Sequence, residues 1–102
     1  MKKLTKEALV RTVALELKER LTGDAFYAAH FFRRVKQLQA EVGEDGSLED
    51  PTLMFELLLE VVGKHEAEVR RVVGAGVEQA FGFLSEVLAY NDEAGEGDSL
   101  GE

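Results

Sequence analysis

The sequence predicts an all-α protein: a compact bundle of four to five helices with a disordered acidic C-terminal tail. Apolar residues recur at spacings of three and four along most of the chain, and capping residues and glycines separate these runs. Signals typical of a half-buried strand, with apolar and polar residues in alternation, are nearly absent. The 102 residues, 45% of them apolar, suffice for one core. We therefore expect one helical domain over residues 1–90 and a flexible tail over residues 91–102.

The first two predicted helices follow one another directly. Thr5 is the expected N-cap of the first helix, which ends near Gly23, and Asp24 is the expected N-cap of the second. The apolar stripe of the first helix consists of Leu9, Val10, Val13, Ala14, Leu17 and Leu21. The stripe of the second helix consists of Tyr27, Phe31, Val35, Leu38 and Val42. Four of its polar side chains should face away from that stripe: Arg33, Arg34, Lys36 and Gln37.

The segment "DPTLMFELLLEVVG" is the most apolar part of the chain. Asp50 is its expected N-cap, and Pro51 fits the first helical position because its missing N–H would have no acceptor there. Gly63 is the expected left-handed C-cap. Only Glu56 and Glu60, four residues apart, interrupt the apolar run and predict one narrow wet edge. A helix apolar on nearly all sides is normally packed by several neighbours, so we expect it at the centre of the bundle.

The remaining residues predict two more helices and the tail. "KHEAEVRRVV" predicts a short helix that ends at "GAG". Its apolar side carries Val69, Val72 and Val73. A last helix is expected from Val77 to about Tyr90, with Gly82 in its middle as a weak point or a site of close helix contact. Its stripe consists of Val77, Phe81, Leu84 and Leu88, widened by Phe83 and Val87. From Asn91 onward the chain is acidic and rich in glycine, which predicts disorder.

Charge is distributed unevenly along the chain, whose net charge is −8. Residues 1–40 carry nine Lys or Arg against four Asp or Glu, whereas residues 41–102 carry three against sixteen. Nucleic-acid binders usually gather cations on a net positive domain, and the acidic half of this chain would repel phosphate. We therefore do not expect a nucleic-acid partner.

Hydropathy and the absence of cysteine bear on the compartment. The longest hydrophobic stretch, residues 53–62, is far shorter than the roughly 20 residues that cross a bilayer. The first residues are basic, as in a signal peptide, but Arg11, Glu16 and Lys18 interrupt the apolar core that such a peptide needs. Without cysteine, disulfides and thiolate metal sites are excluded. We expect a cytoplasmic protein with no membrane partner.

Residues with catalytic or metal-binding chemistry are few and form no known motif. His30 and His65 are the only histidines, and neither belongs to an H-E-x-x-H or Glu-x-x-His pair. His65 should be a solvated surface side chain, and His30 a satisfied one at the margin of the core. Neither a phosphate-binding glycine loop nor a nucleophile elbow occurs. We expect no enzymatic activity, no cofactor and no metal.

Aromatic residues are concentrated in "FYAAHFF", at the start of the second helix. One helix face can bury Tyr27 and Phe31, whereas Phe26 and Phe32 point at other angles. Two interpretations stay open: all four pack among several helices, or some of them form a surface for a protein partner or a homo-oligomer. The same ambiguity applies to the central helix. The candidate partner-binding residues are Phe26, Tyr27, Phe31, Phe32, Met54 and Phe55.

The order of these features resembles a family, the small tail assembly chaperones of long-tailed bacteriophages. The likeness lies in "KEALVRTVALELKERLTGDAFYAAHFFRRVKQLQAE", in "PTLMFELLLEVVG" after an acidic loop, and in the final "VEQAFGFLSEVLAY", and it covers most of residues 5–90. The resemblance implies a non-enzymatic role in virion assembly. A chaperone of this kind binds the long, hydrophobic tape-measure protein in the host cytoplasm and keeps it soluble.

Two other classes of function stay open. The sixteen carboxylates after residue 40 motivate a small acidic regulatory or inhibitory protein that mimics nucleic acid and binds a basic partner surface. The second class is a helical scaffold or oligomerisation module that has no client. Salt dependence separates an acidic mimic from an apolar chaperone, because screening weakens contacts between charges and leaves apolar contacts intact.

Overall fold

Five α-helices form the part of the chain that the computed structural model describes, which is the backbone of residues 5–101 and the side chains of residues 5–91. The helical elements are α1 (Lys6–Gly23), α2 (Ala25–Glu41), α3 (Thr52–Val62), the 3₁₀ turn η1 (Gly63–His65), α4 (Glu66–Val72) and α5 (Val77–Gly101). This described part contains no β-strand, so the predicted all-α fold is confirmed.

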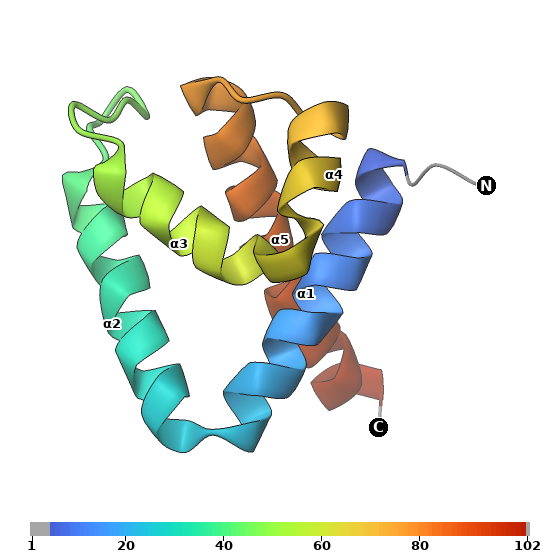
Figure 1. The fold of residues 1–102 in the computed structure, drawn as a ribbon. Helices are drawn as coiled ribbons and strands as arrows, with labels where there is room; N and C mark the ends of the chain where they lie inside the picture. The colour runs from blue at the N-terminus through green and yellow to red at the C-terminus, as the bar shows by residue number, and fades with distance from the viewer. Residues whose placement is uncertain (1–4, 102) are drawn as a thin grey trace.

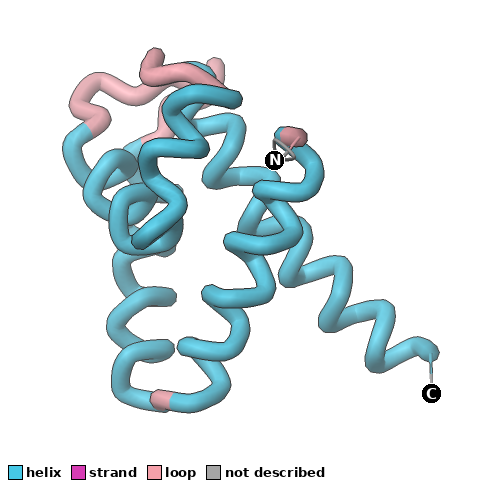
Figure 2. Tube along the Cα trace, turned by 45° about the vertical axis from the view of Figure 1, so that its right-hand side comes forward, coloured by secondary structure: helices cyan, strands magenta, loops and turns pink. Residues whose placement is uncertain are grey.

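The first two helices form a V-shaped hairpin around which the others pack. A single non-helical residue, Asp24, joins α1 to α2 at the tip of the V (Figure 1). The helix α3 lies across the wide end of the V and contacts α1, α2, α4 and α5, while α5 packs along α1. Figure 2 shows the tight turn at Asp24 and, at the other end of α2, the longer loop over residues 42–51. The central position predicted for α3 is therefore confirmed.

Side-chain caps begin the first two helices as predicted. The Thr5 hydroxyl oxygen accepts the backbone N–H of Ala8 at 3.1 Å, and the Asp24 carboxylate accepts that of Tyr27 at 3.0 Å. Each cap satisfies an N–H that has no acceptor within its own helix. Because Asp24 both follows the end of α1 and caps α2, the two helices are joined without a longer loop.

The ends of α3 differ slightly from the prediction. The Asp50 carboxylate accepts both the backbone N–H of Thr52, at 3.0 Å, and the Thr52 hydroxyl, at 2.6 Å. Pro51 therefore precedes the helix instead of occupying its first position, although its carbonyl accepts the N–H of Phe55 at 2.9 Å. At the other end Gly63 has a φ of 53°, which favours glycine as expected.

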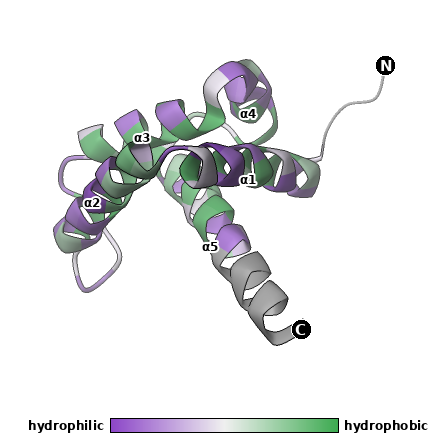
Figure 3. Cartoon of the chain, turned by 90° about the horizontal axis from the view of Figure 1, so that it is seen from below, coloured by the Kyte–Doolittle hydropathy of each residue, from purple (hydrophilic) through white to green (hydrophobic). Residues whose placement is uncertain are grey.

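The core is made of apolar side chains from all five helices. The helices α1 and α3 contribute equal numbers of buried residues, more than any other helix. Hydrophobic positions of α3 and of the first half of α5 are green in Figure 3. The buried residues are Leu9, Val10, Val13, Ala14 and Leu17 of α1, Phe31 and Leu38 of α2, Met54, Leu57, Leu58, Val61 and Val62 of α3, Val69 of α4, and Ala80, Phe83, Leu84 and Val87 of α5. Among the side chains that the structure describes, none that is polar or charged is buried.

The rotation of α5 about its own axis differs from the predicted stripe. Phe83 and Val87, expected at its margin, lie at its centre with Leu84, whereas Val77 is exposed and Phe81 is only half-buried. The helix is apolar around much of its circumference, so the spacing alone could not select the buried side. Packing along α1 selects it.

The last helix also ends later than expected. It continues past Tyr90 to Gly101, where the sequence had predicted an end near Tyr90. The side chains of residues 92–101 and the whole of residue 102 lie outside the described residues. The flexible acidic tail over residues 91–102 therefore stays a prediction.

Gly82→Ala is expected to stabilise the protein. Gly82 is exposed inside α5, and a Cβ there would meet no atom within 4 Å, so the close helix contact considered above is absent. Alanine should raise the free energy of unfolding by about 0.5–1 kcal/mol, since it restricts the unfolded chain and suits a helix. Thermal unfolding followed by circular dichroism measures the change.

Gly63→Ala is the matched control for this prediction. A Cβ at Gly63 also meets nothing within 4 Å, but the positive φ of 53° strains any residue with a side chain. The control should therefore lower the melting temperature. Equal shifts for both variants would contradict the helical conformation assigned to Gly82.

Candidate protein-binding surface

Two aromatic side chains of α2 are turned away from the core. Phe26 is 91% exposed and Phe32 is 51% exposed, although both are among the largest apolar side chains of the chain. Phe26 lies in the first turn of α2, two residues after the cap at Asp24. Solvent-exposed aromatic side chains of this size are typical of surfaces that bind another protein.

Phe32 also borders an apolar groove between α1, α2 and α5, called the α2 groove below. Its volume is about 580 Å³, and its lining consists of Leu17, Leu21, Phe31, Phe32, Val35, Lys36, Gln39, Leu88 and Asn91. Phe31 is fully buried, and the Phe32 ring meets it edge to face with ring centres 5.8 Å apart. The exposed aromatic ring is thus held by the core rather than hanging free in solvent.

The other predicted partner-binding residues are distributed over three places. Phe31 and Met54 are fully buried, so they belong to the core and the interpretation of them as surface residues is corrected. Tyr27 is half-buried between α2 and α3, with its ring 6.1 Å from that of Phe31. Phe55 is half-buried and lines a second hollow of about 340 Å³ between α3, α4 and the start of α5. The structure therefore brings only Phe31 and Phe32 together at the α2 groove.

One polar side chain of the α2 groove was missed by the sequence prediction. Asn91 lines the groove, and its amide nitrogen and oxygen are both buried without a hydrogen-bond partner in the described part of the chain. Its position three residues after Leu88 is a helical spacing that could have placed it on the same face. The sequence prediction assigned Asn91 to the tail instead, because an acidic, glycine-rich segment follows it.

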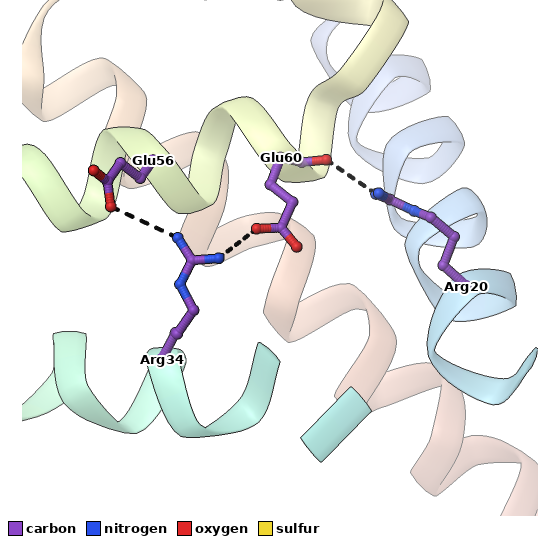
Figure 4. A network of polar contacts seen from close by, with 4 residues as sticks. All are labelled: Arg20, Arg34, Glu56 and Glu60. Carbon is purple, nitrogen blue, oxygen red and sulfur yellow. Dashed lines mark hydrogen bonds and ion pairs between the residues drawn. The ribbon is translucent and has the colours of Figure 1, made fainter. Parts of the chain in front are cut away.

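The basic residues of α2, which were predicted to face away from its apolar stripe, have different surroundings. The Arg34 guanidinium lies 2.5 Å from the Glu60 carboxylate and 3.7 Å from that of Glu56, both on α3 (Figure 4). Arg33 and Lys36 are exposed. The predicted wet edge of α3 is therefore a polar contact with α2.

Arg20 extends this polar contact to α1. Its guanidinium donates to the backbone carbonyls of Glu60 and Val61 at 3.2 Å each (Figure 4), so a side chain of α1 satisfies the last carbonyls of α3. The same guanidinium lies over the Tyr27 ring, 5.7 Å from its centre. Polar contacts in this cluster therefore connect α1, α2 and α3.

Two groups in the cluster have shifted pKa values. Burial raises the pKa of Glu60, but the Tyr27 hydroxyl and Arg34 outweigh it, so this pKa lies below its ordinary 4.5. Burial, followed by the Glu60 carboxylate, raises the pKa of Tyr27 to about 12. At neutral pH the cluster therefore holds an ionised carboxylate beside a neutral phenol.

The histidines also differ from expectation. His65, predicted to be solvated, lies 3.0 Å from the Glu16 carboxylate and connects η1 to α1, while His30 is exposed. The hydrogen bond with His65 lowers the pKa of Glu16. Within residues 5–91, no group of three or more His, Asp or Glu side chains is arranged to hold a metal ion.

Comparisons with known proteins do not assign a family. No protein-family model matches the chain, and no significant match exists among curated proteins or solved structures. None of the helices in the described region combines the length and the hydrophobicity required to cross a bilayer.

Proposed function

We propose that this chain is a non-enzymatic helical module that binds an apolar helix of another protein, and that it acts as a tail assembly chaperone for a tape-measure protein. The observation that carries the proposal is the exposure of Phe26 and Phe32, at 91% and 51%, on the helix that borders the α2 groove. The resemblance of residues 5–90 to phage tail assembly chaperones supplies the client class. The activity would take place in the cytoplasm of the infected cell.

The physical basis is the burial of apolar surface on binding. Full burial of one phenylalanine contributes on the order of 1.5–3 kcal/mol, so two side chains could determine whether a weak client stays bound. A groove bounded by helices accepts an amphipathic helix whose apolar residues recur at spacings of three and four. The net charge of −8 would keep a complex with a hydrophobic client in solution.

Co-expression with the tape-measure protein encoded in the same genome tests the proposal. The client should be recovered in the soluble fraction with this chain, and the double variant Phe26→Ala/Phe32→Ala should lower the recovery by about tenfold or more. Leu15→Ala is the control, because Leu15 is a 45% exposed apolar residue on a different helix, α1, from the two exposed phenylalanines.

Two results would contradict the proposal. Equal recovery with the parent chain and the double variant would mean that the aromatic surface does not bind the client. If the genome encodes no tape-measure protein, the proposed client is excluded, even if Phe26 and Phe32 bind another protein.

The acidic second half favours one other candidate, a regulatory protein that binds a basic partner surface. The loop over residues 42–51 is largely exposed and contributes four carboxylates: Glu44, Asp45, Glu49 and Asp50. Such a complex would dissociate steeply as salt rises, whereas a complex formed by Phe26 and Phe32 would persist. Washing the captured complex at low and high salt separates the two candidates.

A further inference from the structure

We propose that the helix accepted by the α2 groove is acidic, with carboxylates beside its apolar residues. This inference rests on the proposed function, since it concerns the same groove. It names the chemistry of the partner, which neither exposure nor groove volume specifies.

The first argument is the set of cations around the groove. Lys36 lines the groove four residues after Phe32, so both side chains lie on one strip of α2, whereas Arg33 follows Phe32 in sequence and is not part of the lining. Both cations are exposed, and neither has an ion-pair or hydrogen-bond partner among the described residues. An incoming carboxylate would therefore meet Lys36, a cation without a partner among residues 5–91.

Four other cations of the fold are paired with carboxylates, whereas Arg11 and Lys64 are exposed and have no ion pair among the described residues. The pairs are Lys6 with Glu86, Arg34 with Glu60, Arg70 with Glu66, and Arg71 with Glu68. The helix α2 itself contains one acidic residue, Glu41, against three basic ones. The groove thus has a locally positive edge on a protein whose net charge is −8.

The second argument is the pair of amide side chains in the lining of the groove. Gln39 and Asn91 place amide groups in the groove, and the buried amide atoms of Asn91 have no hydrogen-bond partner in the described part of the chain. A buried amide without a partner is unfavourable. If the Asn91 side chain rotates toward the groove, its nitrogen can donate to a carboxylate of the bound helix, while its oxygen would still need a donor.

The net charge of the chain and the proposed contact predict opposite preferences, so an experiment can distinguish them. A chain with a net charge of −8 repels acidic peptides at long range and attracts basic ones. A preference for an acidic helix would therefore come from Lys36 at short range.

The test uses two fluorescent peptides of about 18 residues, or five helical turns, with the same leucine positions on one face. One carries glutamate and the other lysine at the remaining positions, and binding to the full chain is followed by fluorescence anisotropy. At low salt the glutamate peptide should bind about tenfold more tightly than the lysine peptide, and the ratio should approach one near 0.5 M salt, where roughly 4 Å of screening length remains.

Three variants assign the effect to the groove. Lys36→Glu should abolish or reverse the preference for the glutamate peptide. Lys64→Glu is the matched control, because Lys64 is exposed on η1, outside the groove, and the reversal changes the net charge equally. Phe32→Ala should weaken both peptides by a similar factor.

The outcomes separate this inference from the proposed function. Equal or tighter binding of the lysine peptide, still weakened by Phe32→Ala, overturns the acidic partner and leaves the helix-binding function in place. Failure of both peptides to bind overturns both proposals. A dimer in light scattering that Phe32→Ala disperses and that excludes both peptides overturns the acidic helix, because a second copy would then occupy the groove.

Discussion

Leu57→Asp is expected to leave the chain unfolded at neutral pH. Leu57 is fully buried on α3, which, like α1, contacts all four other helices. An aspartate there loses the apolar contacts of leucine and buries a carboxylate with no partner, at a cost of several kcal/mol. The total stability of a domain of this size is about 5–15 kcal/mol, so one such substitution can exceed it.

Leu59→Asp is the matched control, two residues further along the same helix. Leu59 is 49% exposed, so its aspartate stays hydrated and should change the free energy of unfolding by only about 0.5–1 kcal/mol. Far-ultraviolet circular dichroism and thermal melting of both variants measure the difference. A cooperative melting transition for Leu57→Asp near that of the parent chain would contradict the buried position of this side chain.

Arg34→Ala is expected to lower the free energy of unfolding by about 1–3 kcal/mol at pH 7, because it leaves the Glu60 carboxylate without its closest cation. The two groups are 2.5 Å apart, and both side chains are mostly shielded from solvent. Arg33→Ala is the control at the adjacent position, since Arg33 is exposed, and it should change stability by no more than about 0.5 kcal/mol.

The effect of Arg34→Ala should depend on pH. The pKa of Glu60 is lowered in the folded chain, so the stability that this carboxylate contributes is present above its ordinary 4.5 and is lost as the pH falls through the folded value. Urea unfolding of the parent chain and the variant at pH 7 and at an acidic pH below the lowered pKa of Glu60 measures this difference. Once it is protonated, the Glu60 carboxyl no longer requires a cation. An equally large difference at both pH values would exclude Glu60 as the group through which Arg34 acts.

The helix boundaries were largely predictable because the interactions that set them are local. The caps at Thr5 and Asp24 each join residues three positions apart, and the glycine at position 63 has its own positive φ. Local geometry of this kind is encoded in a few neighbouring residues. The end of α5 was predicted less well, since no single residue after Tyr90 forces a helix to stop.

The candidate surface was predicted in part. Phe26 and Phe32 are exposed, as expected if some of the aromatic residues of α2 form a surface. Phe31 and Met54 instead lie in the core. Consecutive residues on a helix point about 100° apart, so Phe31 and Phe32 cannot both face the core. Which of them does so depends on how α2 is rotated against α1 and α5, and residue type does not distinguish two phenylalanines.

The sequence by itself determined the helical class, the caps and the central position of α3, because hydrophobic periodicity and capping act over a few residues of one segment. Only the tertiary structure decided which cations are neutralised and which border the groove. Arg34 meets Glu60 across 26 positions of sequence, while its neighbour Arg33 remains exposed. Such pairings depend on the distance between helices, which cannot be predicted from the order of residues within each helix.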